Sequence, residues 1–192
     1  MQTGHINSAV NLRGYEIRVT LRDIEPTIWR TFRVQEDITL VRLHKVLQVV
    51  MGWKDCHLHE FTFEGGSFGP PDDFDPTRVR SERGVRLTEV LPAIAGASFQ
   101  YEYDFGDSWI HNLTIKDTVP SWTEQAFAVC LDGERACPPE DCGGPDGFAE
   151  LLEAVRDPAL PDHAEMVRWA GTTYDPERFD IERVNQRLRK LR

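Results

Sequence analysis

Residues 99–115 read FQYEYDFGDSWIHNLTI, and this stretch decides the fold class. Apolar residues alternate with polar ones on both sides of a Gly-Asp-Ser segment, which is the period of two strands that share one apolar face. A two-residue turn at 106–107 would mix the faces, whereas a three-residue loop of Gly106, Asp107 and Ser108 keeps the apolar residues together. The sequence therefore predicts a β-hairpin with that loop. The predicted partners are Phe105 with Trp109, Tyr103 with His111, Tyr101 with Leu113, and Phe99 with Ile115.

The segment before the hairpin repeats the strand pattern and adds one helix. Residues 15–22 alternate strictly, and residues 28–34 follow Pro26 as a second strand, antiparallel to the first. Apolar residues at helical spacing predict an amphipathic helix over 39–51 that ends at Gly52. Residues 57–64 alternate again, with His57 and His59 on the same face as two phenylalanines. Residues 65–86 show no periodicity and predict a long surface loop, closed by a helical turn at 87–91.

After the hairpin the pattern changes from strand to helix. A short strand is expected at 127–130, and helices at about 146–155, 163–170 and 181–190, the last capped by Asp180. The fold class is therefore α+β: a mainly antiparallel sheet packed against an amphipathic helix, with a C-terminal helical segment. We expect one domain over residues 14–192, with the sheet and its helix at about 14–130 and the helical part at about 145–192.

The charge of the chain is unevenly distributed and argues against a nucleic-acid surface. The net charge is -10, and residues 55–150 hold 19 acidic but only 6 basic side chains. An acidic surface repels phosphate backbones, so nucleic-acid binding is not favoured there. The basic residues near the C-terminus leave a DNA-associated accessory protein as one hypothesis, although cationic side chains also suit the end of a helix.

The chain is expected to be cytoplasmic. Its N-terminus has no basic region followed by an apolar one, and no stretch approaches the roughly 18–20 apolar residues of a membrane span. The 4 cysteines are then better interpreted as thiols or metal ligands than as a disulfide framework. No membrane partner is expected, whereas a protein partner is compatible with the sequence.

Three cysteines follow one another closely in a turn-rich segment. Cys130, Cys137 and Cys142 could bind zinc together with His59 and His111, because thiolates and imidazoles are the ligands that zinc prefers. The spacings are looser than those of a zinc knuckle, so buried inert cysteines, core histidines and a redox-sensitive thiol pair remain alternatives. On this hypothesis the chain is a binding or interaction module with a structural zinc site.

Four carboxylates offer a different kind of site. Asp104, Asp107, Glu140 and Asp141 could hold a hard cation for hydrolytic or phosphoryl chemistry, which makes a metal-dependent hydrolase or nuclease the alternative function. Asp107 also suits a hairpin loop, where aspartate side chains bond nearby backbone amides. The sequence contains no arrangement that supports a Ser-His-Asp or Cys-His nucleophile, so enzymatic activity remains open.

The order and spacing of several motifs resemble those of the plasmid pRiA4b ORF-3-like proteins. The resemblance covers nearly the whole chain from about residue 14. It implies an α+β fold and an uncharacterised function in proteins found on plasmids, chromosomes and mobile elements. Among the thiols it favours Cys130 and Cys137 over Cys142. The motifs are Tyr15–Leu21, Ile28-Trp29-Arg30, Leu43-His44, Met51-Gly52-Trp53, His57–Phe61, Tyr103–His111 and Cys137–Gly144.

Overall fold

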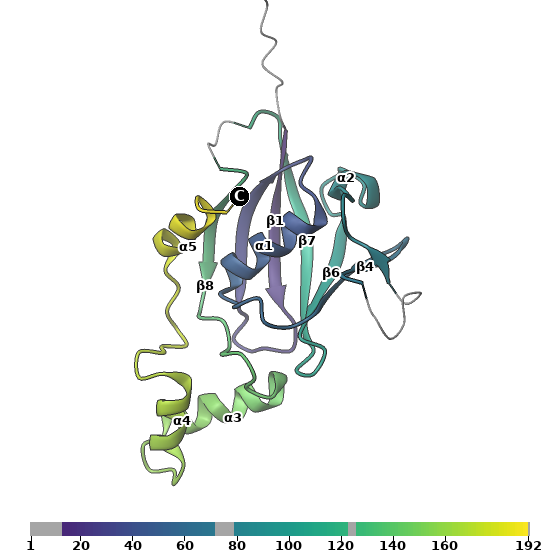
Figure 1. Ribbon diagram of the computed structural model, residues 1–192. Helices are drawn as coiled ribbons and strands as arrows, with labels where there is room; N and C mark the ends of the chain where they lie inside the picture. The colour runs from purple at the N-terminus through teal and green to yellow at the C-terminus, as the bar shows by residue number, and fades with distance from the viewer. Residues whose placement is uncertain (1–12, 72–78, 123–125, 192) are drawn as a thin grey trace, which may run out of the picture.

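The computed structural model describes residues 13–71, 79–122 and 126–191, and a single sheet forms its centre (Figure 1). The sheet has 8 strands in the order β5-β4-β3-β6-β7-β1-β2-β8. Neighbouring strands are antiparallel except β4 and β5, which are parallel. The α+β class with a mainly antiparallel sheet and a C-terminal helical segment is therefore confirmed. The strands are β1 (Gly14–Leu21), β2 (Trp29–Gln35), β3 (His59–Phe63), β4 (Gly66–Gly69), β5 (Arg80–Ser81), β6 (Ser98–Tyr103), β7 (Trp109–Val119) and β8 (Ala128–Glu134).

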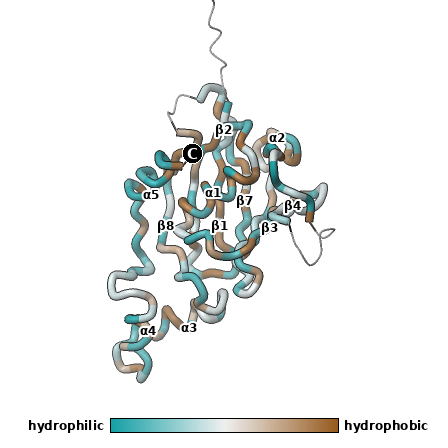
Figure 2. Tube along the Cα trace, in the orientation of Figure 1, coloured by the Kyte–Doolittle hydropathy of each residue, from teal (hydrophilic) through white to brown (hydrophobic). Residues whose placement is uncertain are grey.

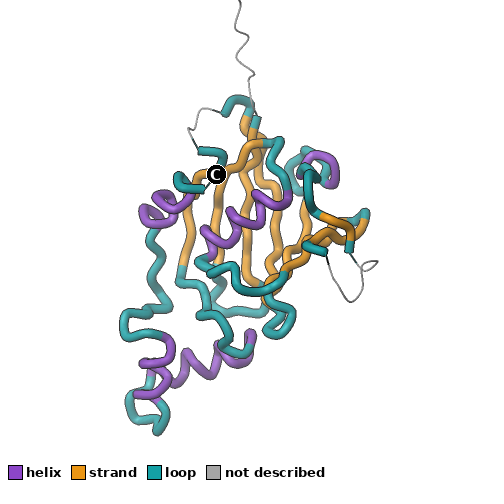
Figure 3. The backbone as a smooth tube through the Cα atoms, viewed as in Figure 1, coloured by secondary structure: helices purple, strands orange, loops and turns teal. Residues whose placement is uncertain are grey.

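Helix α1 (Leu40–Met51) lies across one face of the sheet and closes the core (Figures 1 and 3). It begins where the Thr39 side chain accepts a hydrogen bond from the Arg42 amide, and it ends at Gly52, whose φ of 117° suits glycine. Nine of its residues are buried, and the inward side chains of β1 meet them. Figure 2 shows the apolar residues along the central strands and this helix.

The buried guanidinium of Arg30 links β2 to the segment that follows β8. The Arg30 guanidinium donates to the carbonyls of Val50, Glu134 and Arg135 at 2.9, 2.6 and 2.6 Å, and it stacks on the Phe179 ring at 3.9 Å. Burial lowers the pKa of Arg30 to about 10. Because four carbonyls, including that of Trp29 at 2.7 Å, accept from this one side chain, its loss would leave buried acceptors without partners.

The predicted hairpin register is wrong by two residues. Tyr103 pairs with Trp109, Tyr101 with His111 and Phe99 with Leu113, so the loop is Asp104–Ser108 and the side chain of Phe105 is exposed. Asp104 adopts a left-handed φ of 59°, its side chain accepts from the Gly106 amide, and its carbonyl accepts from the Ser108 amide. A shift of two residues keeps the same faces inward, so apolar alternation alone could not exclude it.

The segment after β3 also differs from the expected surface loop. Residues 66–69 and 80–81 form β4 and β5, which extend the sheet, while residues 72–78 lie outside the described part. Helix α2 (Leu87–Val90) confirms the predicted helical turn. Strand β8 is longer than the predicted strand at 127–130, because pairing with β2 continues to Glu134 across an irregularity in register.

The C-terminal helices occupy two places in the fold. Helices α3 (Gly144–Arg156) and α4 (His163–Ala170) pack on each other beyond one end of the sheet, and α5 (Ile181–Leu188) returns to lie against β8 and α1 (Figure 1). Asp180 caps α5, as predicted. Within the described ranges, no helix is long and apolar enough to cross a membrane.

Candidate functional site

Three segments that are distant in sequence meet at the end of the sheet near α3. His57 lies in the turn before β3, Asp104 opens the loop between β6 and β7, and Glu140 and Asp141 lie in the turn before α3. The pairing of β3 with β6 brings the first two together, and the Asp104 amide donates to the Leu58 carbonyl at 2.9 Å. The sheet register therefore places His57 beside the Asp104 loop.

Three carboxylates converge on one nitrogen of the His57 imidazole. Nε2 of His57 lies 3.2 Å from Asp141 Oδ1, 3.5 Å from Asp104 Oδ2 and 3.8 Å from Glu140 Oε2. Two ligands each about 2.1 Å from an ion stand about 3.0 Å apart at right angles and about 3.4 Å apart in a tetrahedron. The distances from His57 to Asp141 and Asp104 are therefore close to those between neighbouring ligands in a metal site, whereas Glu140 lies farther from His57.

Two atoms of this cluster are buried and make no hydrogen bond. They are His57 Nε2 and Glu140 Oε2. The Glu140 side chain is only 6% exposed and that of Asp104 only 10%, whereas Asp141 stands at the surface. Asp104 and Glu140 thus leave negative charge in a poorly solvated place, which is costly unless a cation compensates it.

Backbone and phenol groups fix the direction of Glu140. Its Oε1 accepts from the Lys54 amide at 2.6 Å and from the Tyr103 hydroxyl at 3.2 Å, so Oε2 is left to face His57. The Tyr103 hydroxyl in turn accepts from the Cys56 amide at 3.0 Å. Burial raises the pKa of Tyr103, partly offset by the backbone bond from Cys56, while the side-chain bond to Cys56 and the charge of Glu140 raise it further, so the phenol stays protonated and remains a donor.

Close backbone packing holds the acidic turn before α3 against the hairpin loop. A Cβ atom on Gly144 would lie 2.6 Å from the Asp107 carbonyl oxygen, and one on Gly147 would lie 2.0 Å from the Cys142 carbonyl oxygen. The Asp107 carboxylate accepts from the Gly143 amide at 3.1 Å. Asp107 therefore ties the two segments together and does not join the cluster.

Two overlapping groups of potential metal ligands stand out among the residues that the structure describes. One is His57, Asp104 and Asp141, and the other is Cys56, His57 and Glu140; within each group the ligand atoms lie within 4.8 Å of one another. Three of the four carboxylates considered from the sequence thus come together, around a histidine that was not assigned to the site. The alternation of residues 57–64 placed His57 on the same face as His59, which was the only sequence pattern that pointed to it. Its position beside Asp104 depends on the sheet register.

The two histidines predicted as zinc ligands lie elsewhere on the sheet and have partners. His59 bonds Glu82 through Nε2 at 3.0 Å and stacks on His44 at 3.7 Å. His111 is fully buried, accepts from Trp53 Nε1 at 3.1 Å through Nε2, and lies 3.1 Å from the Tyr101 carbonyl through Nδ1. Because strand β6 separates their strands, the two imidazoles do not share a group of ligands.

Of the predicted cysteine ligands, Cys130 and Cys137 are buried thiols and Cys142 is half-buried. Cys130 lies on β8 with its sulfur 3.7 Å from the Thr31 and Asp132 carbonyl oxygens, and burial raises its pKa to about 11. Burial also raises the pKa of Cys137 well above the ordinary value, and that of Cys142 to about 12. Neither Cys130 nor Cys137 belongs to a described ligand group, so their role as zinc ligands stays a prediction.

Comparisons with known proteins establish kinship. The model of the plasmid pRiA4b ORF-3-like protein family matches residues 13–183. The uncharacterised protein y4hQ of Sinorhizobium fredii is 38% identical over 176 residues, which cover 91% of this chain and 90% of that protein. The crystal structure of MM3350, a protein of unknown function from Methanosarcina mazei, superposes on this chain with a TM-score of 0.78 and covers 89% of this chain and 97% of that one. The two sequences are 32% identical. The resemblance of the motifs is therefore confirmed.

Proposed function

The chain belongs to the plasmid pRiA4b ORF-3-like protein family, and we propose that it is a hydrolase that depends on a divalent metal ion. The observation that carries the proposal is the buried, hydrogen-bond-free Oε2 of Glu140 facing His57 beside two further carboxylates. Mixed imidazole and carboxylate ligands suit Mn²⁺, Fe²⁺ or Zn²⁺. The acidic balance of residues 55–150 favours a substrate other than a nucleic acid.

Each side chain has a distinct role in this proposal. His57, Asp104 and Asp141 would hold the ion. A divalent ion there would lower the pKa of a bound water and so supply a nucleophile for an electrophilic carbon or phosphorus of the substrate. Glu140, whose Oε2 faces His57, would accept the proton of that water and return it to the leaving group, which departs with the electron pair of the broken bond.

Metal affinity is the first test. Untagged protein, stripped of metal, is titrated with Mn²⁺ and Zn²⁺ by calorimetry, and we expect one site per chain. Asp104→Asn keeps a side chain that tolerates the left-handed backbone at φ 59° but removes a charged ligand. We expect it to weaken binding by about a hundredfold or more, since even outer-shell partners are worth about 10–100-fold.

A matched control lies in the same loop. Asp107→Asn removes a carboxylate that bonds Gly143 and lies outside the ligand groups, so metal affinity should be unchanged. Equal losses in both variants, or no binding by the wild-type protein, would refute the site. Cys130→Ser tests the predicted Cys/His zinc site in the same titration, since only that site loses affinity with this thiol.

Activity is the second test and separates the base from the ligands. The metal-loaded protein is assayed against activated ester, amide and phosphate compounds. Glu140→Gln retains an oxygen that can accept from the Lys54 amide, so it should keep metal affinity within a few-fold and lose turnover. Full turnover in this variant would remove Glu140 from the mechanism. Metal binding without turnover of any compound in the wild-type protein would leave a metal-binding module.

A further inference from the structure

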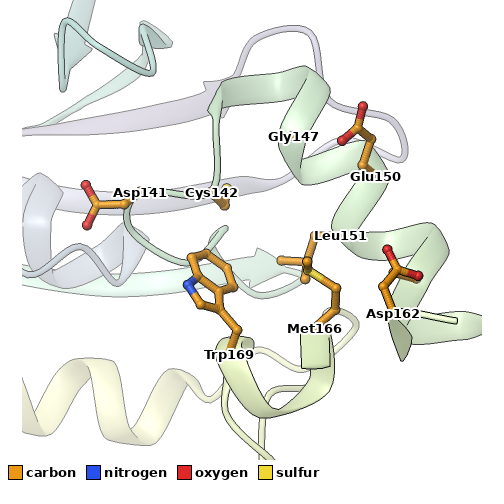
Figure 4. A pocket seen from close by; sticks show the side chains of 9 residues that line it. Asp141, Cys142, Gly147, Glu150, Leu151, Asp162, Met166 and Trp169 are labelled. Atoms are coloured by element: carbon orange, nitrogen blue, oxygen red, sulfur yellow. The ribbon is translucent and has the colours of Figure 1, made fainter. Parts of the chain in front are cut away.

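A pocket of about 260 Å³ opens between α3 and α4, next to the candidate metal site (Figure 4). Leu151, Met166 and Trp169 gather in its middle in Figure 4, with Asp141 on one side and Glu150 and Asp162 on the other. Asp141 belongs to both places, because it lines the pocket and also lies 3.2 Å from His57 Nε2. An occupant of the pocket would therefore reach the metal site.

Trp169 gives the pocket an open aromatic wall. It is 49% exposed, and α4 contains no fully buried residue although its apolar side chains face α3. Its ring therefore offers a large apolar face to an occupant of the cavity. Leu151 on the opposite wall is buried, so the floor of the pocket is preformed.

The charges around the pocket select the occupant. Among the described residues, those that line it include Asp141, Glu150 and Asp162 and no lysine, arginine or histidine. An aliphatic stem would pack between Met166 and Trp169, while a cationic head would lie on the side of Glu150 and Asp162, opposite Asp141 (Figure 4). The volume is slightly below that of pockets for drug-sized ligands, which are about 300–1,000 Å³, and it suits one long side chain.

We propose that this pocket binds the side chain of a lysine or arginine residue of a peptide substrate. The peptide backbone that follows this side chain would then lie by Asp141 at the metal site. The recognition step depends only on the pocket residues, whereas its meaning as substrate selection rests on the proposed hydrolase function.

Indole resonances provide a direct readout of binding. The chain has 5 tryptophans, and Trp169→Phe identifies the indole N–H signal of Trp169 in a ¹H–¹⁵N spectrum. The metal-free protein is titrated with acetyl-Ala-Lys-Ala-amide and with the norleucine peptide, which has the same stem but no charge. We expect the lysine peptide to shift the Trp169 signal in a saturable way and the norleucine peptide to bind at least tenfold more weakly.

Variants of the rim separate charge recognition from folding. Glu150→Gln with Asp162→Asn removes two exposed carboxylates, of which Asp162 makes no side-chain capping bond to α4, and it should weaken binding of the lysine peptide at least tenfold. An unmoved Trp169 signal, or equal affinity for both peptides, would overturn the proposal. Asp104→Asn should retain peptide binding, so a failed metal site and a failed pocket give different results.

Discussion

The buried His111 predicts a specific loss of stability in mild acid. Its Nε2 accepts from the Trp53 indole, so its Nδ1 carries the proton and donates to the Tyr101 carbonyl. A second proton would have to displace the Trp53 bond inside the core. Burial lowers the pKa of His111 to about 4, partly offset by the backbone groups of Tyr101 and Trp109. Between this value and the ordinary pKa near 6.5, the unfolded chain binds a proton that the folded chain does not.

The magnitude follows from this difference in proton binding. Above pH 6.5 both states are neutral at His111 and the effect vanishes; as the pH falls towards 4, stability is progressively lost. From pH 7 to pH 5 the free energy of unfolding should drop by roughly 2 kcal/mol through this residue alone. His111→Gln can still accept from the Trp53 indole but cannot titrate.

Urea denaturation at pH 7 and pH 5 in the presence of a thiol reductant measures the effect through tryptophan fluorescence. The wild-type protein should lose roughly 2 kcal/mol more than His111→Gln between the two pH values. The comparison removes other acid-sensitive groups, including His44, whose pKa is lowered by burial and by His59. Equal losses in the two proteins would refute the argument that His111 is held neutral.

Three shorter predictions concern packing and thiol reactivity. Arg30→Lys loses the guanidinium bonds to buried carbonyls and should lower the free energy of unfolding by about 3 kcal/mol. The control Arg33→Lys changes a half-exposed side chain and should cost less than about 1 kcal/mol. Equal losses of the two variants in urea denaturation would contradict this prediction. Gly147→Ala would place a Cβ atom 2.0 Å from a carbonyl oxygen and should lower the free energy of unfolding by about 2 kcal/mol or more. Gly65→Ala has open space around it and should lower the free energy of unfolding by less than about 1 kcal/mol in the same assay. Iodoacetamide should modify Cys56, the exposed cysteine, before the three others, and Mn²⁺ should slow that reaction; peptide mapping that finds a buried thiol modified first would exclude this order.

The sequence predicted the elements well because each depends on local periodicity. The helix that ends at Gly52 and the strand at 15–22 bury one face each, and burial imposes a period that is visible in the residues. The hairpin loop was wrong because its length depends on the left-handed backbone and side-chain bonds of Asp104. These compete with apolar alternation, which is unchanged by a shift of two residues.

The candidate site was only partly visible in the sequence. The sequence predicted the carboxylates of Asp104, Glu140 and Asp141 as possible ligands, but it assigned His59 and His111, and not His57, to a metal site. His59 and His111 point into the sheet core, whereas His57 stands just outside β3. The turns before β3, between β6 and β7 and before α3 meet because of the strand order of the sheet. A local sequence pattern does not show which strand ends are neighbours.

The cost of assembling the acidic cluster is itself an argument for a cation. Asp104 and Asp141 both have left-handed φ angles near 60°, and Glu140 buries an oxygen that makes no hydrogen bond. Features of this kind reduce stability and collect at functional sites.

Without metal, Asp104→Asn should therefore raise the free energy of unfolding by about 1 kcal/mol, because it relieves repulsion between neighbouring carboxylates. With Mn²⁺ at about 100 times its Kd, the wild-type protein gains about 2.7 kcal/mol and the variant, at a hundredfold lower affinity, about 0.4 kcal/mol. The order of stability should thus reverse on adding metal, and an unchanged order in thermal denaturation would mean that the carboxylates are held together for another reason.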